Sequence, residues 1–247
     1  MSNQLVLIAF VAAISIAVRA DDDNDDRLRA VPFVFVGEKG DCGPVPGSNI
    51  VTAAWLRGMG LPDNGQPNTT LVDVATANTP ASRKDPHTGL LLNKNGPSGD
   101  CSAAGARIRG VEGTKVGADF ALGFDYRNGT HCGAGAPRFN VVSRLGKDET
   151  FHFVGGCGNA APTAAPQDPT EWSRVRFLTA NPAQAFPPIA PGSVIVSITL
   201  IHDEGTENAG VEDPRGVGLS NVDNIFINGR FIRSGKGIEP HGNSDTD

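Results

Sequence analysis

The chain has 247 residues, 31 of them glycine and 18 proline, and a formal net charge of −6. A negative chain repels nucleic acid and anionic lipid surfaces, so neither is an expected partner. This length allows one large β-domain or two smaller ones, and either can bury a substantial core.

The first segment is an apolar run from Leu5 to Val18, followed by the small-residue pattern Val18-Arg19-Ala20. This pattern is typical of a secretory signal peptide cut after Ala20. The alternative, an uncleaved anchor, is disfavoured because the run is shorter than the roughly 18 residues that a spanning helix needs. Cleavage removes Arg19 and no acid, so −6 becomes −7. We expect a signal peptide at 1–20, a secreted or periplasmic protein, and no membrane segment after cleavage.

Two tails and one turn-rich region follow from composition. Residues 21–30 are acidic and residues 235–247 are poor in apolar side chains, so both are predicted to be disordered. Residues 31–102 are rich in turn formers, with only IVTAAWL and GLLLNK as ordered pieces. Since they hold too few large apolar residues for a core of their own, we expect a loop-rich region packed on a β-sandwich at 103–234.

Four cysteines in an exported chain predict two disulfides, for which three connectivities are possible. The favoured pairs are Cys42–Cys101 and Cys132–Cys157. The second pair flanks two candidate neighbouring strands. Zinc is the alternative, but the spacing contains no C-x-x-C, and the nearest histidine, His131, adjoins Cys132 and could hardly bind the same ion.

Short apolar segments between glycines and prolines, without sustained helical periodicity, are typical of an all-β protein. In FALGFDYR, four large residues share one strand face: Phe120, Leu122, Phe124 and Tyr126. The segments RFNVV and FHFV alternate in the same way through Phe139 and Val141, and through Phe151 and Phe153. This alternation places His152 on an outer face.

Two segments near the C-terminus carry further strand signals. SVIVSITLI is apolar on both faces, so it predicts a central, buried strand. In IFINGRFI, Asn228-Gly229 separates two β-rich triplets by two residues, which predicts a type I′ hairpin. The hairpin pairs Ile227 with Arg230, Phe226 with Phe231, and Ile225 with Ile232.

No G-x-S-x-G, H-E-x-x-H, P-loop or dinucleotide motif is present, which weighs against a catalytic role without deciding it. Paired carboxylates could serve glycoside hydrolysis. The pool for that chemistry is Asp125, Asp203, Glu204 and Asp223. Because surface acids greatly outnumber catalytic ones, solvated surface positions are the competing interpretation.

Sugar-binding surfaces use exposed aromatic rings, and Trp172 is the best candidate here. In WSRVRF it shares a strand face with Arg174 and Arg176, while Val175 and Phe177 face the core. These three residues form the predicted ligand-binding set. The competing interpretation buries the tryptophan, as is usual for this residue.

The stretch 201–225, IHDEGTENAGVEDPRGVGLSNVDNI, carries six carboxylates and several glycines. Calcium takes six to eight oxygens, including backbone carbonyls that a glycine-rich loop can present. Asp203, Glu204 and Asp223 lie at the ends of two predicted strands, so they are the expected side-chain ligands of a structural Ca²⁺. The stretch lacks EF-hand spacing, and the alternative is a solvated acidic loop.

Residues 103–232 resemble jelly-roll carbohydrate-binding modules, whose final strands often carry a D-[DN]-[VI] stretch like Asp223-Asn224-Ile225. The chain is also similar to secreted bacterial proteins with a signal peptide and an APRFNV strand. The resemblance implies an antiparallel β-sandwich of jelly-roll type and a structural calcium held by an acid near that position. We expect a secreted, non-catalytic protein that binds an extracellular glycan. The alternatives are a secreted hydrolase using loop carboxylates, and a structural surface or matrix protein without a small ligand.

Overall fold

The computed structural model describes residues 27–36, 50–66, 85–99, 101–206 and 216–239. These residues form antiparallel β-strands and one short 3-10 helix, η2 (Cys157–Asn159), so the predicted all-β class is confirmed. No helix among them is long and apolar enough to cross a membrane. The predicted signal peptide lies outside the described residues.

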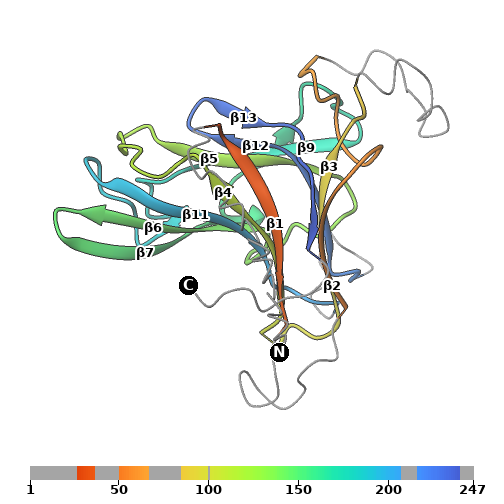
Figure 1. The fold of residues 1–247 in the computed structure, drawn as a ribbon, viewed down its shortest axis with the longest axis horizontal. Helices are drawn as coiled ribbons and strands as arrows, with labels where there is room; N and C mark the ends of the chain where they lie inside the picture. Colours follow the sequence, from red (N-terminus) through yellow and green to blue (C-terminus); the bar gives the residue numbers. More distant parts are fainter. Residues whose placement is uncertain (1–26, 37–49, 67–84, 100, 207–215, 240–247) are drawn as a thin grey trace, which may run out of the picture.

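The strands form two sheets that pack around one hydrophobic core (Figure 1). The six-stranded sheet has the order β1 (Arg29–Phe35), β4 (Ala103–Arg109), β11 (Val194–His202), β6 (Arg138–Leu145), β7 (Asp148–Gly155), β10 (Ala185–Phe186). The eight-stranded sheet has the order β14 (Ile238–Glu239), β2 (Ile50–Leu56), β3 (Gly89–Asn95), β12 (Leu219–Ile227), β5 (Ala121–Arg127), β9 (Trp172–Leu178), β8 (Thr163–Ala164), and β13 (Arg230–Ile232) pairs with β12.

The strand pairs are nested along the chain. β6 pairs with β7, β5 with β9, β4 with β11, and β3 with β12, all antiparallel. The pairs alternate between the two sheets. The outermost pair joins the first and last strands of the nest, β3 and β12. Four nested pairs wound into two facing sheets make a jelly roll, so the predicted sandwich type is confirmed.

The sandwich extends upstream of the predicted boundary at residue 103. IVTAAWL and GLLLNK are strands β2 and β3, as expected, and β3 is the first strand of the nest. Its residues Leu90 and Leu92 are fully buried in the shared core. At the ends of the chain, β1 begins at Arg29 and β14 covers 238–239, so both expected tails contribute strand residues.

Most predicted core positions are confirmed. The four large residues of FALGFDYR are buried on the inner face of β5, and Phe139 and Val141 on that of β6. The ring of Phe124 lies 6.0 Å from that of Phe139 on the facing sheet, centroid to centroid. Strand β11 is central in its sheet, between β4 and β6, but only one of its faces is buried throughout.

The predicted orientation of β7 is wrong. His152 is buried, whereas Phe151 and Phe153 are 47% and 44% exposed. The register explains this inversion: His152 lies opposite Val141, which faces the core, and paired residues share a face. The imidazole has partners inside the sandwich, because its Nε2 lies 2.8 Å from the Ser143 hydroxyl and its Nδ1 2.7 Å from the Pro187 carbonyl.

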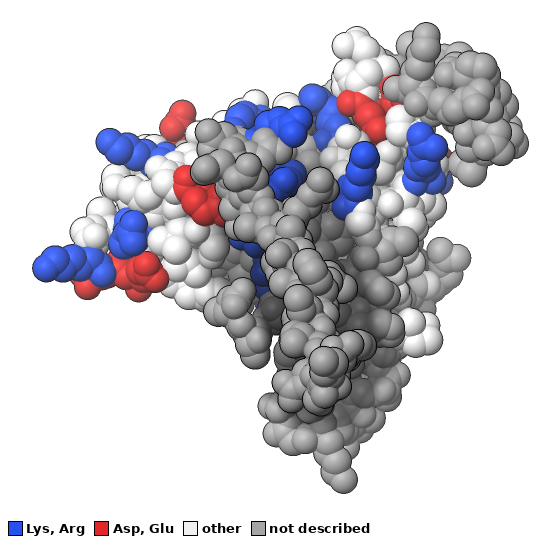
Figure 2. Space-filling model, in the orientation of Figure 1, with Lys and Arg blue, Asp and Glu red and all other residues white. Residues whose placement is uncertain are grey.

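The predicted C-terminal hairpin is confirmed in every pair, with Ile225 opposite Ile232, Phe226 opposite Phe231, and Ile227 opposite Arg230. Asn228 and Gly229 both have positive φ, 44° and 89°, as a type I′ turn requires. Basic side chains gather over β12 and β13 in the view of Figure 2, although the whole chain is acidic.

Candidate functional site

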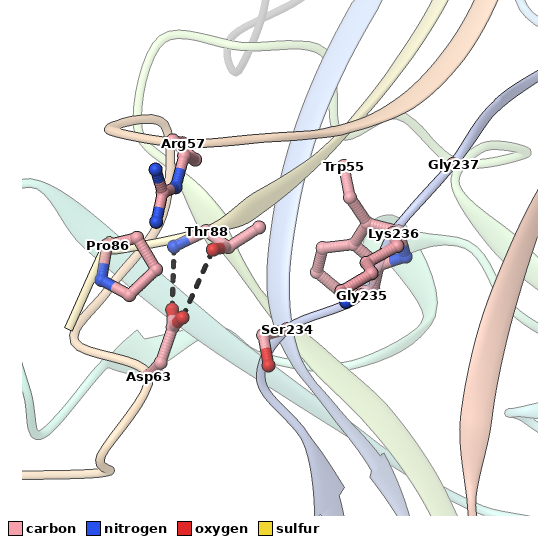
Figure 3. A pocket seen from close by; sticks show the side chains of 9 residues that line it. All are labelled: Trp55, Arg57, Asp63, Pro86, Thr88, Ser234, Gly235, Lys236 and Gly237. Carbon is pink, nitrogen blue, oxygen red and sulfur yellow. Dashed lines mark hydrogen bonds between the residues drawn. The ribbon is translucent and has the colours of Figure 1, made fainter. Parts of the chain in front are cut away.

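A cavity of about 630 Å³ opens between the segments that follow β2 and β13 (Figure 3). In Figure 3, Arg57, Asp63, Pro86 and Thr88 lie on one side of it, and Trp55 lies on the other with Gly235 and Lys236. Short strand β14 pairs with β2, which holds the chain after β13 beside Trp55. The lining residues are Trp55, Arg57, Asp63, Pro86, Thr88, Ser234, Gly235, Lys236 and Gly237. We call this cavity the Trp55 pocket.

The tryptophan wall of the pocket is held in place. The indole Nε1 donates a hydrogen bond to the Ala30 carbonyl at 2.9 Å, and the Trp55 amide donates to the Gly237 carbonyl at 3.3 Å. Gly235 packs so closely on the ring that a Cβ would collide with it. The pocket therefore has a fixed, largely apolar wall.

Asp63 supplies the carboxylate of the pocket. Its Oδ1 accepts the Thr88 amide at 2.6 Å and its Oδ2 accepts the Thr88 hydroxyl at 3.1 Å (Figure 3). Burial raises the pKa of Asp63, although these hydrogen bonds oppose the shift. Each oxygen can accept more than one hydrogen bond, so the oriented carboxylate keeps capacity for a ligand donor.

Two exposed cations, Arg57 and Lys236, stand at the mouth of the pocket. With the Asp63 carboxylate and the Thr88 hydroxyl they place donors and acceptors around an apolar wall. This combination suits a ligand that has both hydroxyl groups and apolar C–H surface.

The predicted exposure of Trp172 is wrong. Its side chain is 2% exposed and packs with Leu61 and Ala165. Leu61 belongs to the segment after β2, which folds across the start of β9. Alternation along β9 correctly places Val175 and Phe177 in the core, but it carries no information about a distant segment that covers the other face.

Arg174 and Arg176 are brought together by a buried acid, Asp125. No sequence pattern predicted that Asp125 would pair with them. Asp125 is fully buried and accepts Arg174 Nε at 2.7 Å and Nη2 at 2.8 Å. Arg176 Nη2 lies 3.4 Å from the same carboxylate, and Asn224 donates to it at 2.8 Å. Burial lowers the pKa of Arg176 to about 10. Through these contacts Asp125 links β5 to β9 and β12.

Asp223 is a second wholly buried carboxyl and lies opposite Asp125 across β12 and β5. It accepts the Leu61 amide at 2.7 Å and the Asn224 amide at 2.5 Å. Burial raises its pKa well above the ordinary value, and the charges of Asp63 and Asp125 add to the effect. Asp223 ties the segment after β2 to the sheet.

The other two predicted calcium ligands have protein partners. Arg138 binds Asp203 through two hydrogen bonds of 2.7 Å, and His131 Nε2 lies 2.6 Å from Glu204. Burial opposes ionisation of Asp203, but the Arg138 bond and charge outweigh it and lower its pKa. Burial likewise opposes ionisation of Glu204, but the hydrogen bond and charge of His131 outweigh burial and lower the pKa of Glu204.

Among the described residues, no three His, Cys, Asp or Glu side chains are grouped so as to hold a metal ion. The three predicted ligands are thus not brought together there. The remaining acids of the stretch, Glu207, Glu212 and Asp213, lie outside the described residues. A calcium site on this stretch stays a prediction.

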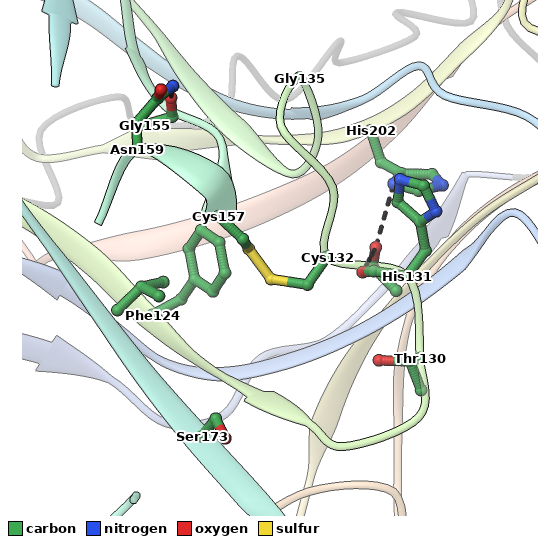
Figure 4. The surroundings of a disulfide bond; sticks show 12 residues. Phe124, Thr130, His131, Cys132, Gly135, Gly155, Cys157, Asn159, Ser173 and His202 are labelled. Atoms are coloured by element: carbon green, nitrogen blue, oxygen red, sulfur yellow. Dashed lines mark hydrogen bonds between the residues drawn. A yellow bond between two sulfur atoms is a disulfide. The ribbon is translucent and has the colours of Figure 1, made fainter. Parts of the chain in front are cut away.

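The disulfide Cys132–Cys157 is confirmed, with a Cα–Cα distance of 5.4 Å (Figure 4). It closes the β6–β7 hairpin and lies near Phe124 of the facing sheet. Cys101 is also disulfide-bonded, and its expected partner, Cys42, lies outside the described residues.

Figure 4 also shows His131 and His202 side by side, with ring centroids 5.2 Å apart. His202 is fully buried, and burial lowers its pKa to about 4, so it is neutral at pH 7. Its Nδ1 lies 3.0 Å from the Ser220 hydroxyl, which donates to the His131 carbonyl. His202 is inaccessible to solvent, and the cluster joins β11 to β12.

Exposed aromatic rings do occur, but on the outer face of the six-stranded sheet. Phe151, Phe153 and Phe186 are each close to half exposed, and Phe186 pairs with Phe153 across β10 and β7. The Arg138 guanidinium lies 5.1 Å from the Phe153 ring centroid. The sequence alone does not identify these rings as exposed, because alternation along β7 does not say which of its faces is inward.

In comparisons with protein-family models, curated proteins and solved structures, nothing matches this chain. Its function is therefore inferred from the geometry of the Trp55 pocket and the surfaces around it.

Proposed function

We propose that this protein is a secreted, non-catalytic carbohydrate-binding protein and that the Trp55 pocket holds one sugar unit of an extracellular glycan. The observation that carries the proposal is the pocket itself, in which Pro86 and the exposed edge of the largely buried Trp55 supply apolar surface opposite an oriented carboxylate. A pyranose has the same two properties, an apolar C–H face and a rim of hydroxyl groups.

Each polar group of the pocket has a role in this proposal. The Asp63 carboxylate accepts hydrogen bonds from one or two sugar hydroxyls, and Thr88 keeps it oriented. Arg57 and Lys236 donate to ring or hydroxyl oxygens at the mouth. The volume of about 630 Å³ is within the range of small-molecule sites and accommodates a sugar together with water.

A secreted glycan hydrolase is the second candidate, because the raised pKa of Asp63 is typical of a general acid. Hydrolysis of this kind needs two carboxylates that flank the scissile bond. Asp63 is the single carboxylate among the described residues that line the pocket. Asp85 accepts the Asp63 amide at 2.7 Å but is not part of the lining. A pocket with one carboxylate in its lining favours binding over hydrolysis.

The test is a screen of neutral and acidic oligosaccharides, followed by calorimetry with the best ligand. Asp63→Asn keeps the shape and the Thr88 contacts but removes the charge, so affinity should fall roughly tenfold or more. Asp148→Asn makes the same change on an exposed residue of β7 and should leave affinity unchanged.

The same oligosaccharides are assayed for cleavage. Cleavage that Asp63→Asn abolishes would establish the hydrolase instead. If no glycan binds, the proposal fails, and a structural surface or matrix role becomes the better explanation.

A further inference from the structure

Arginine and phenylalanine side chains stack on the outer face of the eight-stranded sheet, on β9, β12 and β13. Phe226 and Phe231 are a cross-strand pair whose rings lie 5.2 Å apart. The Arg176 guanidinium lies 4.7 Å from the Phe226 centroid, and that of Arg233 lies 4.5 Å from the Phe231 centroid. Arg174 lies 5.9 Å from Phe231. We call these five residues the arginine–phenylalanine patch.

Positive charge is in excess in this patch. Three guanidiniums face one carboxylate, Asp125, which Arg174 and Arg176 already share. Among the described residues, no acid lies within ion-pair distance of Arg233, and its buried Nε has no hydrogen-bond partner. The excess stands out in a chain with a net charge of −6. At physiological salt, charges beyond about 10 Å are largely screened, so the local excess decides what binds.

The geometry leaves these arginines able to bind an anion. Stacking uses the flat face of a guanidinium and leaves its N–H groups to donate in the plane. Arg174 already uses its Nε and Nη2 on Asp125, and Arg176 uses its Nη1 on the Phe124 and Val175 carbonyls, so a ligand is bound by the remaining Nη hydrogens. Arg174 and Arg176 side chains remain 23% and 25% exposed beside the buried Asp125. Planar N–H pairs of this kind bind carboxylate and sulfate oxygens in a bidentate manner.

Two glycines make room for the stack. A Cβ on Gly123 would lie 2.7 Å from Arg176 Cδ, and one on Gly65 would lie 3.0 Å from Arg233 Cζ. Gly65 belongs to the segment after β2, so that segment contacts both the Trp55 pocket, through Asp63, and the patch. Arg233 also directly precedes Ser234, which lines the pocket.

We propose that the arginine–phenylalanine patch is an oxyanion-binding surface and that its partner is an acidic polysaccharide bearing carboxylate or sulfate groups. Arg233 supplies a half-buried guanidinium that has no ion pair among the described residues, and the Arg174–Arg176 pair supplies a second cationic group against the same ring, that of Phe231. A polymer with repeated acidic groups can engage both points at once. This site goes beyond the Trp55 pocket and does not require that the pocket bind sugar.

The experiment measures binding of the full chain to polygalacturonate, dextran sulfate, neutral dextran and polyglutamate, at low and at raised salt. We expect one or both acidic polysaccharides to bind, dextran not to bind, and affinity to fall as salt rises. Polygalacturonate against dextran sulfate distinguishes carboxylate from sulfate recognition.

The main variant is Arg233→Gln, chosen because Arg233 has no ion pair with any described residue and its loss leaves Asp125 paired. Affinity for the acidic polysaccharide should fall roughly fivefold or more, since a charged hydrogen bond is lost. Arg233→Lys keeps the charge but loses the planar fork and should restore only part of the affinity. Arg144→Gln, which removes the same charge on the β6–β7 hairpin, should change little.

Three results would overturn the proposal: no binding of either acidic polysaccharide at low salt, equal losses from Arg233→Gln and Arg144→Gln, or polyglutamate binding as well as or better than the polysaccharides. The last result would indicate an acidic protein partner or charge attraction alone. Failure here is distinct from failure of the Trp55 pocket, because Asp63→Asn tests that pocket with neutral oligosaccharides.

Discussion

Part of the outer face of the eight-stranded sheet is covered by another segment of the chain, whereas the outer face of the six-stranded sheet carries exposed rings. On the first, the segment after β2 binds Asp223 through the Leu61 amide and covers Trp172. On the second, Phe151, Phe153 and Phe186 remain close to half exposed along β7 and β10.

The difference shows how cover changes the chemistry that a sheet face can carry. Under cover, Asp125 and Asp223 are fully buried, and each is satisfied by specific partners. A buried polar or charged group requires such partners, and their loss is costly. On the open face, changing a side chain should reduce the stability of the protein only slightly. The four substitutions below test this contrast between the two faces.

The largest effect is expected from Arg174→Met, which leaves Asp125 buried without its bidentate partner. Removing one member of a buried pair costs about 3–5 kcal/mol, and the contact of Arg176 with Asp125 makes the lower end the better expectation. Urea denaturation measures the change. Arg144→Met, which breaks an exposed pair on the other sheet, should cost about 1 kcal/mol or less. Similar losses for the two variants would break the comparison.

Asp223→Asn should cost about 1–3 kcal/mol at low pH, because one buried backbone amide loses its acceptor. The pKa of Asp223 is raised in the folded state, so the folded protein retains a proton that the unfolded chain has released. Wild-type stability should thus fall as pH rises above the ordinary carboxyl pKa. The asparagine variant lacks this slope, so the gap between the two should narrow with rising pH in melting curves. A constant gap would show that folding does not raise the pKa of Asp223.

Gly229→Val tests the hairpin that carries Phe231 and Arg233 onto the outer face of the eight-stranded sheet. A β-branched residue resists the φ of 89°, so the variant should lose roughly 1 kcal/mol or more. Gly99→Val is the control, since a Cβ there meets nothing within 4 Å and the backbone has no positive φ. Denaturation midpoints measure both, and an unchanged midpoint for Gly229→Val would contradict the turn.

The smallest effect is expected from Phe151→Thr on the open face, within about 0.5–1 kcal/mol, because much of the ring is already in water and threonine suits a strand. Phe139→Ala on the neighbouring strand removes a fully buried ring and should cost about 3–5 kcal/mol. A large loss at Phe151 would show that the open face is covered after all.

Features that depend on neighbours in sequence were predictable. The Asn228-Gly229 turn, the alternation of β5 and the central place of β11 each depend on one short segment. The Cys132–Cys157 pair was also predictable, since both cysteines flank one hairpin. The jelly-roll topology came from a resemblance, because no local pattern specifies which strands pair at long range.

Features that depend on distant segments were not predictable. Alternation divides β7 into two faces without saying which is inside, so the bulkier Phe151 and Phe153 were preferred to His152. The burial of Trp172 cannot be predicted from its own segment, because Leu61, more than a hundred residues away, covers it. The Trp55 pocket joins three separate segments, and only the abundance of turn formers around Asp63 hinted that this region could form a site.

The nesting of the strand pairs also sets the order in which the fold can be completed. β6 and β7 are neighbours in the chain and can pair as soon as both are made. Leu90 of β3 can pair with Val222 only after β12 has been made. Pairings between distant segments require the closure of long loops, which slows folding. During synthesis, β3 is an unpaired strand on its β12 side until nearly the whole chain has emerged. Because β12 lies between β3 and β5, the eight-stranded sheet stays in two parts until β12 is made.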